Sequence, residues 1–163
     1  MKIISVFNNK GGVGKSTLSF HLGKALGLMG KKVLFVDLDP QCNLTISAMR
    51  ERELEKIWQE EDAYIDDFED AKKNKEKFSR IMSETRSIHF LLKPAEDGVN
   101  DIESLPPAKS IGDNVYMIPG RLSIHQFENR ISERWSGLYQ SDNLSIRTIT
   151  YIRRLCERYA DIL

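Results

Sequence analysis

Residues 10–17 have the sequence Lys-Gly-Gly-Val-Gly-Lys-Ser-Thr, and this stretch decides the fold. Three glycines within 10–14 exclude a regular helix or strand there and mark a special backbone path. The apolar, β-branched run before them, 2–7 (KIISVF), predicts a short buried strand. From Lys15 onward, apolar residues recur at three- and four-residue spacing, which predicts a helix that ends at Gly30.

A second apolar run, 32–36 (KVLFV), leads directly into Asp37-Leu38-Asp39-Pro40. The first 40 residues therefore predict a strand, a glycine loop, a helix and a second strand. Two strands joined in this way are expected to lie parallel as neighbours. The sequence thus predicts an α/β fold with a mostly parallel sheet flanked by helices.

The glycine loop has the chemistry of a triphosphate site. Its glycines allow backbone N–H groups to converge on phosphate oxygens, and the following helix adds its free N–H groups and dipole. The Lys15 ammonium reaches the β- and γ-phosphates, the Ser16 hydroxyl is placed to ligate Mg²⁺, and Thr17 contacts the α-phosphate. We therefore predict that ATP and Mg²⁺ bind on Lys10, Gly11, Gly12, Val13, Gly14, Lys15, Ser16 and Thr17.

Asp37 and Asp39 follow the second predicted strand. Two carboxylates at the C-terminal end of a parallel strand suit a Mg²⁺ site. Hydrolysis of a phosphate also needs a group that orients the attacking water. Taken alone, such a pair serves equally well as a helix or turn cap. Beside the phosphate loop we favour the functional role.

The loop departs from the ordinary pattern G-x-x-x-x-G-K-[ST], because Asn9 stands where the first glycine belongs and Lys10 follows it. This variant, K-G-G-x-G-K-[ST], resembles the deviant Walker A class of P-loop ATPases, which includes the ParA and Soj partitioning ATPases and the MinD division-site ATPases. The resemblance implies that Lys10 reaches the phosphates of a partner subunit, so that ATP promotes a homodimer. Catalytic roles then fall to Lys10, Lys15 and Asp39.

The stretch 37–41 resembles the D-x-D-P-Q motif of ParA-type proteins. That resemblance implies that Asp37 lies near the metal with Ser16, and that Asp39 positions the attacking water. Cys42 stands where many relatives have glycine, and we interpret it as a small tolerated residue. The family's function implies a Mg²⁺-dependent ATPase in plasmid or chromosome partitioning. Its implied partners are non-specific DNA and a centromere-binding, ParB-like protein.

The rest of the chain predicts further helices and one more strand. Residues 50–113 are expected to be a charged helical excursion and loop at the surface. The predicted elements are helices over 43–86, a strand or helix end at 87–92, mostly loop over 94–113, a strand at 115–118, and helices with apolar core faces over 123–139 and 144–158.

Residues 160–163 predict the start of one more buried strand. Residues 158–163 loosely resemble the lead-in to the Walker B strand of ParA-type proteins. We therefore expect residues 1–163 to be the N-terminal part of one P-loop ATPase domain, incomplete at the C-terminus. Such a chain is expected to hydrolyse ATP slowly or not at all.

Composition narrows the function classes. The chain has 24 Lys and Arg against 24 Asp and Glu, which argues against a chain-wide surface for nucleic acid. A solvated helix face is favoured over a DNA site for the arginines at 147, 153, 154 and 158.

Cys42 and Cys156 have no metal-ligand spacing and fit a reducing cytoplasm, and the resemblance to the family implies that the protein can associate with the nucleoid. The N-terminus has neither a signal peptide nor a membrane span.

Other functions stay open at this stage. A division-site ATPase of the same superfamily needs a C-terminal amphipathic helix for the membrane, and the sequence shows none. An iron–sulfur electron carrier of this class needs suitably placed cysteines. A tyrosine kinase of the class would show a tyrosine cluster at its tail. A nucleotide-binding regulator without turnover remains an alternative.

Overall fold

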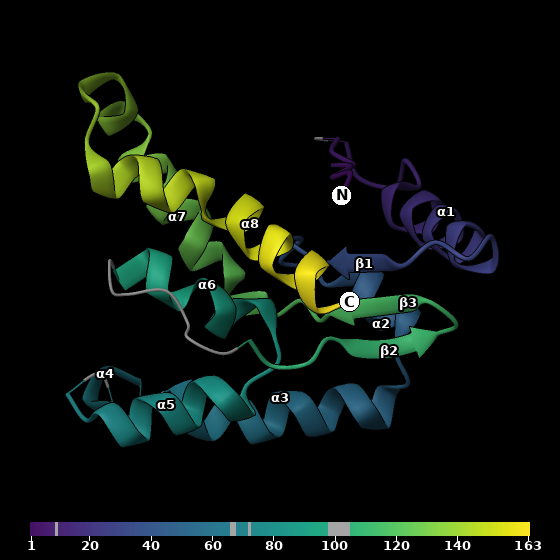
Figure 1. Ribbon diagram of the computed structural model, residues 1–163, viewed down its shortest axis with the longest axis horizontal. Helices are drawn as coiled ribbons and strands as arrows, with labels where there is room; N and C mark the ends of the chain where they lie inside the picture. The colour runs from purple at the N-terminus through teal and green to yellow at the C-terminus, as the bar shows by residue number, and fades with distance from the viewer. Residues whose placement is uncertain (9, 66–67, 72, 98–104) are drawn as a thin grey trace.

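A small mixed sheet forms the centre of the protein. The computed structural model describes residues 1–8, 10–65, 68–71, 73–97 and 105–163. Its strands lie in the order β1-β3-β2 (Figure 1). Strand β1 (Val33–Val36) pairs in parallel with β3 (Val115–Ile118), and β3 pairs antiparallel with β2 (Lys109–Gly112). The predicted α/β fold is confirmed, although among the described strands only one of the two pairs is parallel.

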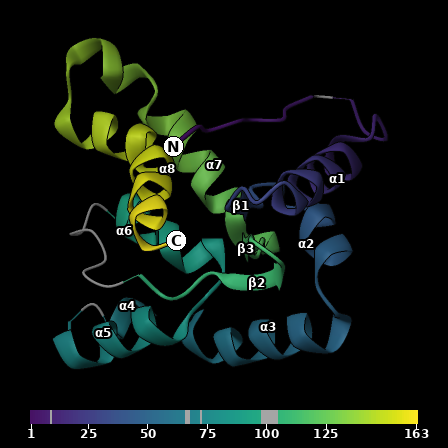
Figure 2. The ribbon, with the colours of Figure 1, turned by 45° about the vertical axis from the view of Figure 1, so that its right-hand side comes forward.

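Helices cover both faces of this sheet. Figure 2 shows α1 and α2 on one side, α6, α7 and α8 on the other, and α3 along the side of β2. The helices are α1 (Lys15–Leu28), α2 (Asn43–Ala48), α3 (Glu51–Ile65), α4 (Phe68–Ala71), α5 (Lys75–Glu84), α6 (Ile88–Asp97), α7 (His125–Arg134) and α8 (Asn143–Ile162), with 3₁₀ turns η1 (Leu122–Ile124) and η2 (Ser136–Gln140).

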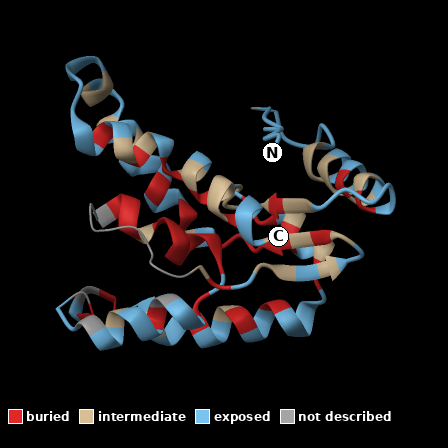
Figure 3. Cartoon of the chain, viewed as in Figure 1, coloured by how far each residue is buried: buried red, intermediate tan, exposed pale blue. Residues whose placement is uncertain are grey.

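The two faces of the sheet belong to two apolar clusters, because successive side chains of a strand point to opposite faces. Phe35 and Met117 lie in the cluster formed with α2 and α3. Ile118 lies in the other, formed mainly with α4 to α8, and Leu34 and Val36 pack against it. Figure 3 shows that buried residues concentrate in β3 and α6, whereas the N-terminal segment is exposed and α1 is mostly exposed or half-buried.

The strand predicted at residues 2–7 is wrong. Residues 1–8 have no secondary structure, and all of them are exposed. An extended segment is stable as a strand only when a neighbour satisfies its backbone groups, and among the described residues β1 pairs with β3 alone. The predicted pair of parallel strands in the first 40 residues is therefore wrong. The parallel pair is instead β1 and β3, and α2 to α6 and then β2 lie between them in the sequence.

The strand predicted to begin at residues 160–163 is also wrong. Helix α8 continues to Ile162, and its last turn closes with a hydrogen bond from the Leu163 N–H to the Tyr159 carbonyl. Tyr159 is buried, and its hydroxyl donates to the Pro106 carbonyl at 2.8 Å. The helical periodicity of the buried residues before it thus extends through this end of the chain.

The charged region is helical, as predicted, but it is more than a surface excursion. Helix α3 buries Leu54 and Ile57, and α5 buries Ile81 in the other cluster. Residues 88–97 form α6, so 87–92 contains the beginning of a helix and neither a strand nor a helix end, and the loop predicted from 94 is wrong up to 97. Strand β2 was not predicted, and residues 98–104 of the predicted loop lie outside the described part.

The two C-terminal helical predictions are confirmed by α7 with η2 and by α8. Phe127 and Leu155 are buried on their apolar faces, as expected. Leu144 at the start of α8 is an exception with 39% of its surface exposed, and so is Trp135 with 52%. Its position at the junction of α7 and η2 places it beyond the part of α7 that packs on the core.

A buried histidine makes the stability of this fold sensitive to acid. His89 is 1% exposed, and neither of its ring nitrogens has a hydrogen-bond partner among the described residues. Burial lowers the pKa of His89 from 6.5 to about 3, and the positive charges of Lys93, Arg121 and His125 add to the effect. The folded state therefore holds His89 neutral where the unfolded chain is protonated.

We expect the free energy of unfolding to decrease as the pH falls below about 6.5, because the unfolded state then binds the additional proton. The slope approaches about 1.4 kcal/mol per pH unit, so the loss at pH 5 is about 2 kcal/mol. Chemical denaturation at several pH values measures it. A His89→Leu variant should flatten this slope, whereas His21→Asn at an exposed position should not. An unchanged slope in His89→Leu would contradict the assignment.

Candidate nucleotide-binding site

Helix α1 is oriented by its close approach to the sheet. A Cβ built on Gly23 would lie 2.1 Å from Cζ of Phe35, and one on Gly27 would lie 2.4 Å from Cγ2 of Val115. Val115 is paired with Val33 at the start of β1. The C-terminal part of α1 therefore lies over the beginning of β1, and the part nearer the N-terminus of α1 lies over the end of β1. The N-terminus of α1 consequently points toward the end of β1, where the two aspartates follow.

The glycine loop turns into α1 through two residues in the left-handed region. Gly12 has φ 71° and Gly14 has φ 83°, a conformation that side chains other than glycine rarely adopt. The first helical hydrogen bond runs from the Leu18 N–H to the Gly14 carbonyl at 2.8 Å. The N–H groups of residues 15–17 come before it and have no partner within the helix. They are donors for an anion at this end of α1.

The predicted phosphate-binding residues are therefore together on one loop and one helix turn. Lys15 and Ser16 are half-buried, whereas Lys10 and Thr17 are exposed. The Lys10 N–H donates to Oδ1 of Asn8 at 2.8 Å, which curls the backbone where the loop begins. Gly11, Gly12, Val13 and Gly14 are exposed as well. The loop is thus open on its outer side, with its two lysine side chains available for phosphate oxygens.

Asp37 is held in place just beyond β1. It is 3% exposed, and its Oδ2 accepts two hydrogen bonds from Thr45, one from the N–H at 2.9 Å and one from the hydroxyl at 2.6 Å. Its Oδ1 accepts from the Asp39 N–H at 3.2 Å. Thr45 lies in the first turn of α2, so the Asp37 carboxylate caps that helix.

Asp39 occupies a turn. Its Oδ1 accepts from the Gln41 N–H at 2.9 Å, and its carbonyl accepts from the Cys42 N–H at 2.8 Å. Asp39 therefore caps this turn, which is the role that an Asp-x-Asp pair can have without any ligand. The structure also places this half-buried side chain two residues from Asp37, at the end of β1 toward which α1 points.

The backbone conformation of Cys42 explains why a glycine would fit this position. Cys42 has φ 53°, in the left-handed region, where a glycine is unstrained. It is buried, and burial together with the negative charges of Asp37 and Asp39 raises its pKa to about 12. The thiol is therefore neutral and unreactive at ordinary pH, in agreement with its interpretation as a small filling residue.

The residues present fit a magnesium ion. Mg²⁺ takes oxygen ligands, keeps several waters and usually binds one or two carboxylates together with phosphate oxygens. The Asp37 carboxylate and the Ser16 hydroxyl are donors of this kind, and in the described residues the Ser16 hydroxyl has no hydrogen-bond partner. No group of three or more His, Cys, Asp or Glu side chains suited to a metal is found in the described residues, so the substrate's phosphates would complete the ligand set.

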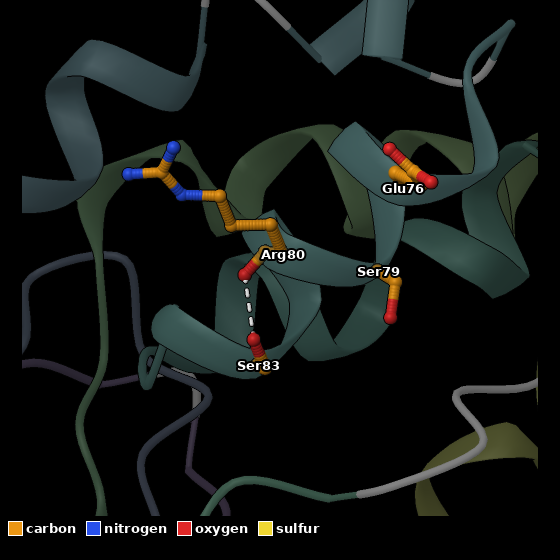
Figure 4. A pocket seen from close by; sticks show the side chains of 4 residues that line it. All are labelled: Glu76, Ser79, Arg80 and Ser83. Atoms are coloured by element: carbon orange, nitrogen blue, oxygen red, sulfur yellow. Dashed lines mark hydrogen bonds between the residues drawn. The ribbon is translucent and has the colours of Figure 1, made fainter.

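The surface hollows do not compete with this site. One lies on α5 and is lined by Glu76, Ser79, Arg80 and Ser83 (Figure 4). The figure shows these side chains diverging, with the Ser83 hydroxyl bonded to the Arg80 carbonyl of its own helix. A second hollow lies between the N-terminal residues and α8. Neither brings polar groups together around a common point.

The sequence did not reveal the tertiary contacts that lie behind Asp37 and Asp39. Thr45 also accepts a hydrogen bond from the Gly120 N–H at 2.8 Å, which joins the end of β1 to the residues after β3. The spacing from Asp37 to Thr45 is visible in the sequence, but its contact with Gly120 is a matter of tertiary structure. The buried ion pair between Glu61 and Arg121 was missed for the same reason.

The sequence profile of the AAA domain family matches residues 1–144 of the chain. The chain belongs to this family. The AAA domain match includes the glycine loop, both aspartates and all three strands of the sheet. In the described residues, no helix is both long enough and apolar enough to cross a bilayer.

Curated relatives of this AAA domain protein match over short stretches. The sporulation initiation inhibitor protein Soj of Bacillus subtilis is 59% identical over 44 residues, which are 27% of this chain and 17% of Soj. The chromosome partitioning protein ParA of Caulobacter vibrioides is 46% identical over 43 residues, 26% of this chain and 16% of ParA. The chromosome-partitioning ATPase Soj of Thermus thermophilus is 55% identical over 42 residues, 26% of this chain and 17% of that relative. The predicted resemblance to ParA/Soj-type ATPases is confirmed.

A solved structure extends the similarity to most of the AAA domain chain. The crystal structure of protein DIP2308 from Corynebacterium diphtheriae superimposes with a TM-score of 0.71 and 30% sequence identity. The superposition covers 93% of this chain and 46% of that chain. The chain thus spans under half the length of this structural relative, and its curated relatives are matched over less than a fifth of theirs.

Proposed function

We propose that this ParA-family chain binds ATP with Mg²⁺ on residues 10–17, dimerises on ATP and takes part in ATP hydrolysis that drives DNA partitioning. The observation that carries the proposal is the glycine loop, which enters the N-terminus of α1 through the left-handed Gly14. That geometry presents free N–H groups and Lys15 to a triphosphate. The relatives named ParA and Soj chromosome-partitioning proteins support the cellular role.

Each residue has a part in this proposal. The main-chain N–H groups of the loop and the ammonium of Lys15 bind and orient the β- and γ-phosphates. Ser16 and Asp37 would hold Mg²⁺, which when bound neutralises phosphate charge. Asp39 accepts a hydrogen bond from the attacking water and orients it toward the phosphate. Burial of Asp37 and the turn around Asp39 keep these carboxylates in place before substrate arrives.

Lys10 is the residue through which ATP is expected to cause dimerisation. Its position at the start of the loop and its exposure leave the ammonium available to the phosphates of a second subunit. Non-specific DNA and a ParB-like centromere-binding protein are the partners proposed for the dimer. The arginines of α8 are less suited to DNA than a free basic face, because Arg153 pairs with Glu157 and Arg154 donates to the Arg147 carbonyl.

Sedimentation with and without ATP and Mg²⁺ tests this function. We expect the nucleotide to convert monomers to dimers, and a Lys10→Ala variant to stay monomeric while it still binds ATP, because Lys10 acts across the interface. Lys2→Ala, another exposed lysine of the same segment, serves as the control and should dimerise normally. Dimerisation of Lys10→Ala equal to that of the wild type would contradict the proposed role of Lys10.

A further inference from the structure

A continuous set of hydrogen bonds leads away from Asp37 into the body of the protein. The Thr45 hydroxyl donates to Oδ2 of Asp37 at 2.6 Å and accepts from the Gly120 N–H at 2.8 Å. Thr45 is 0% exposed, so water does not substitute for either bond. A hydroxyl with both of these bonds has its orientation fixed from two sides.

The connection continues from Gly120 to helix α3. The Gly120 carbonyl accepts from the indole Nε1 of Trp58 at 3.1 Å, and the Trp58 carbonyl accepts from the Arg121 guanidinium at 3.2 Å. Arg121 then pairs with Glu61 on the same helix at 3.3 Å. Gly120 and Arg121, the two residues that follow Pro119, are therefore both bonded to α3.

Packing at Gly120 leaves little room for independent movement. A Cβ placed on Gly120 would lie 3.1 Å from Cγ of Asp37 and 3.1 Å from Sγ of Cys42. A shift of the Asp37 carboxylate toward a ligand therefore changes the contacts of Gly120 directly, as well as through Thr45. Tightly packed interiors transmit such shifts instead of absorbing them.

We propose that Thr45 is a positioning residue for Asp37, and that with Gly120 and Trp58 it couples the phosphate site to helix α3. The inference rests on the proposed function, because Asp37 is the residue that faces the metal of ATP. Thr45 holds Oδ2 with two hydrogen bonds, whereas Oδ1 accepts only the longer bond of 3.2 Å from the Asp39 N–H, so Oδ1 is the oxygen that would bind a cation. When Oδ1 binds, the carboxylate, the Thr45 hydroxyl and the Gly120 peptide move together, and Trp58 reports the movement.

The chain supplies its own spectroscopic probe for this coupling. It contains two tryptophans, Trp58 and the exposed Trp135, so a Trp135→Phe background leaves Trp58 as the sole emitter. In this background we expect ATP with Mg²⁺ to change the Trp58 emission. Thr45→Val, which keeps the shape but removes the hydroxyl, should abolish the change, and Thr45→Ser should restore it. Thr150→Val on the exposed face of α8 is the matched control.

Calorimetry gives a second, independent measurement. Thr45→Val should lower the Mg²⁺-dependent gain in ATP affinity about tenfold, the usual effect of losing a hydrogen bond to a charged group. The affinity for ATP in the presence of a chelator should stay unchanged. A general loss of structure would reduce both affinities, so this difference separates positioning from folding.

The outcomes distinguish the inference from the function on which it rests. If the wild-type chain shows no ATP binding by calorimetry, the proposed function fails and the coupling falls with it. If the wild type binds and Thr45→Val keeps the wild-type emission change and Mg²⁺ dependence, the function stands and the coupling is wrong. Should Thr45→Val not fold, hydrogen exchange on the wild type decides: ATP with Mg²⁺ must alter the protection of Gly120 and of α3, and unaltered protection overturns the proposal.

Discussion

Replacing Glu61 by alanine is expected to destabilise the protein by about 3–5 kcal/mol, the range for breaking a buried ion pair on one side. Glu61 is 2% exposed. Its Oε1 accepts from the N–H groups of Arg86 at 2.6 Å and Ser87 at 2.8 Å, and its Oε2 accepts from the Ser87 hydroxyl and from Arg121. The carboxylate thus caps the start of α6 and neutralises a buried guanidinium. Its loss leaves several buried donors without an acceptor.

The neighbouring aspartate provides the control. Asp62 also pairs with Arg121, but its side chain is 63% exposed. Because exposed ion pairs contribute about 0–1 kcal/mol, Asp62→Ala should change stability little. Urea denaturation of both variants measures the difference. A similar cost for the two substitutions would show that the Glu61 cap does not depend on burial.

Replacing Gly23 by valine is expected to cost about 3 kcal/mol or more, because its side chain would overlap the ring of Phe35. The Cβ alone would lie 2.1 Å from Cζ and 2.5 Å from Cε1 of that ring. Phe35 is 8% exposed and stacks on Phe20, with ring centroids 6.4 Å apart, so it has little space to move. Helix α1 would separate from the sheet and displace the glycine loop at its N-terminus.

A size-compensating pair checks this explanation. The double variant Gly23→Val with Phe35→Leu should recover part of the lost stability, since the smaller side chain makes room for the valine. Thermal unfolding of the single and double variants gives the comparison. A single variant as stable as the wild type would mean that α1 does not pack on β1 as described.

The local parts of the fold could be predicted from the sequence. The glycine loop, α1 and β1 follow from glycine spacing and apolar periodicity, and all three match the structure apart from small shifts at their ends. The same reasoning failed for residues 2–7 and 160–163. Both segments are apolar enough for a strand, but a strand also requires a neighbour, and single-sequence patterns do not show which segments pair.

The candidate site was predictable in its chemistry but not in its support. Lys15, Ser16 and the two aspartates are recognisable from their residue types and spacing. The contacts behind the aspartates join residues that are distant in sequence: Thr45 and Gly120 are 75 residues apart, and Glu61 and Arg121, farther from the aspartates, are 60 apart. Because such contacts form only through the tertiary fold, no local pattern indicates them.

The central claim is that the loop at residues 10–17 binds the phosphates of ATP, and a calorimetric titration of ATP with Mg²⁺ tests it most directly. We expect the wild-type chain to bind, and Lys15→Ala to bind about tenfold more weakly or worse, because a charge-assisted contact with the phosphates is lost. Lys31→Ala, an exposed lysine beyond α1, should bind as the wild type does. Absence of binding by the wild type, or equal binding by Lys15→Ala, would contradict the account.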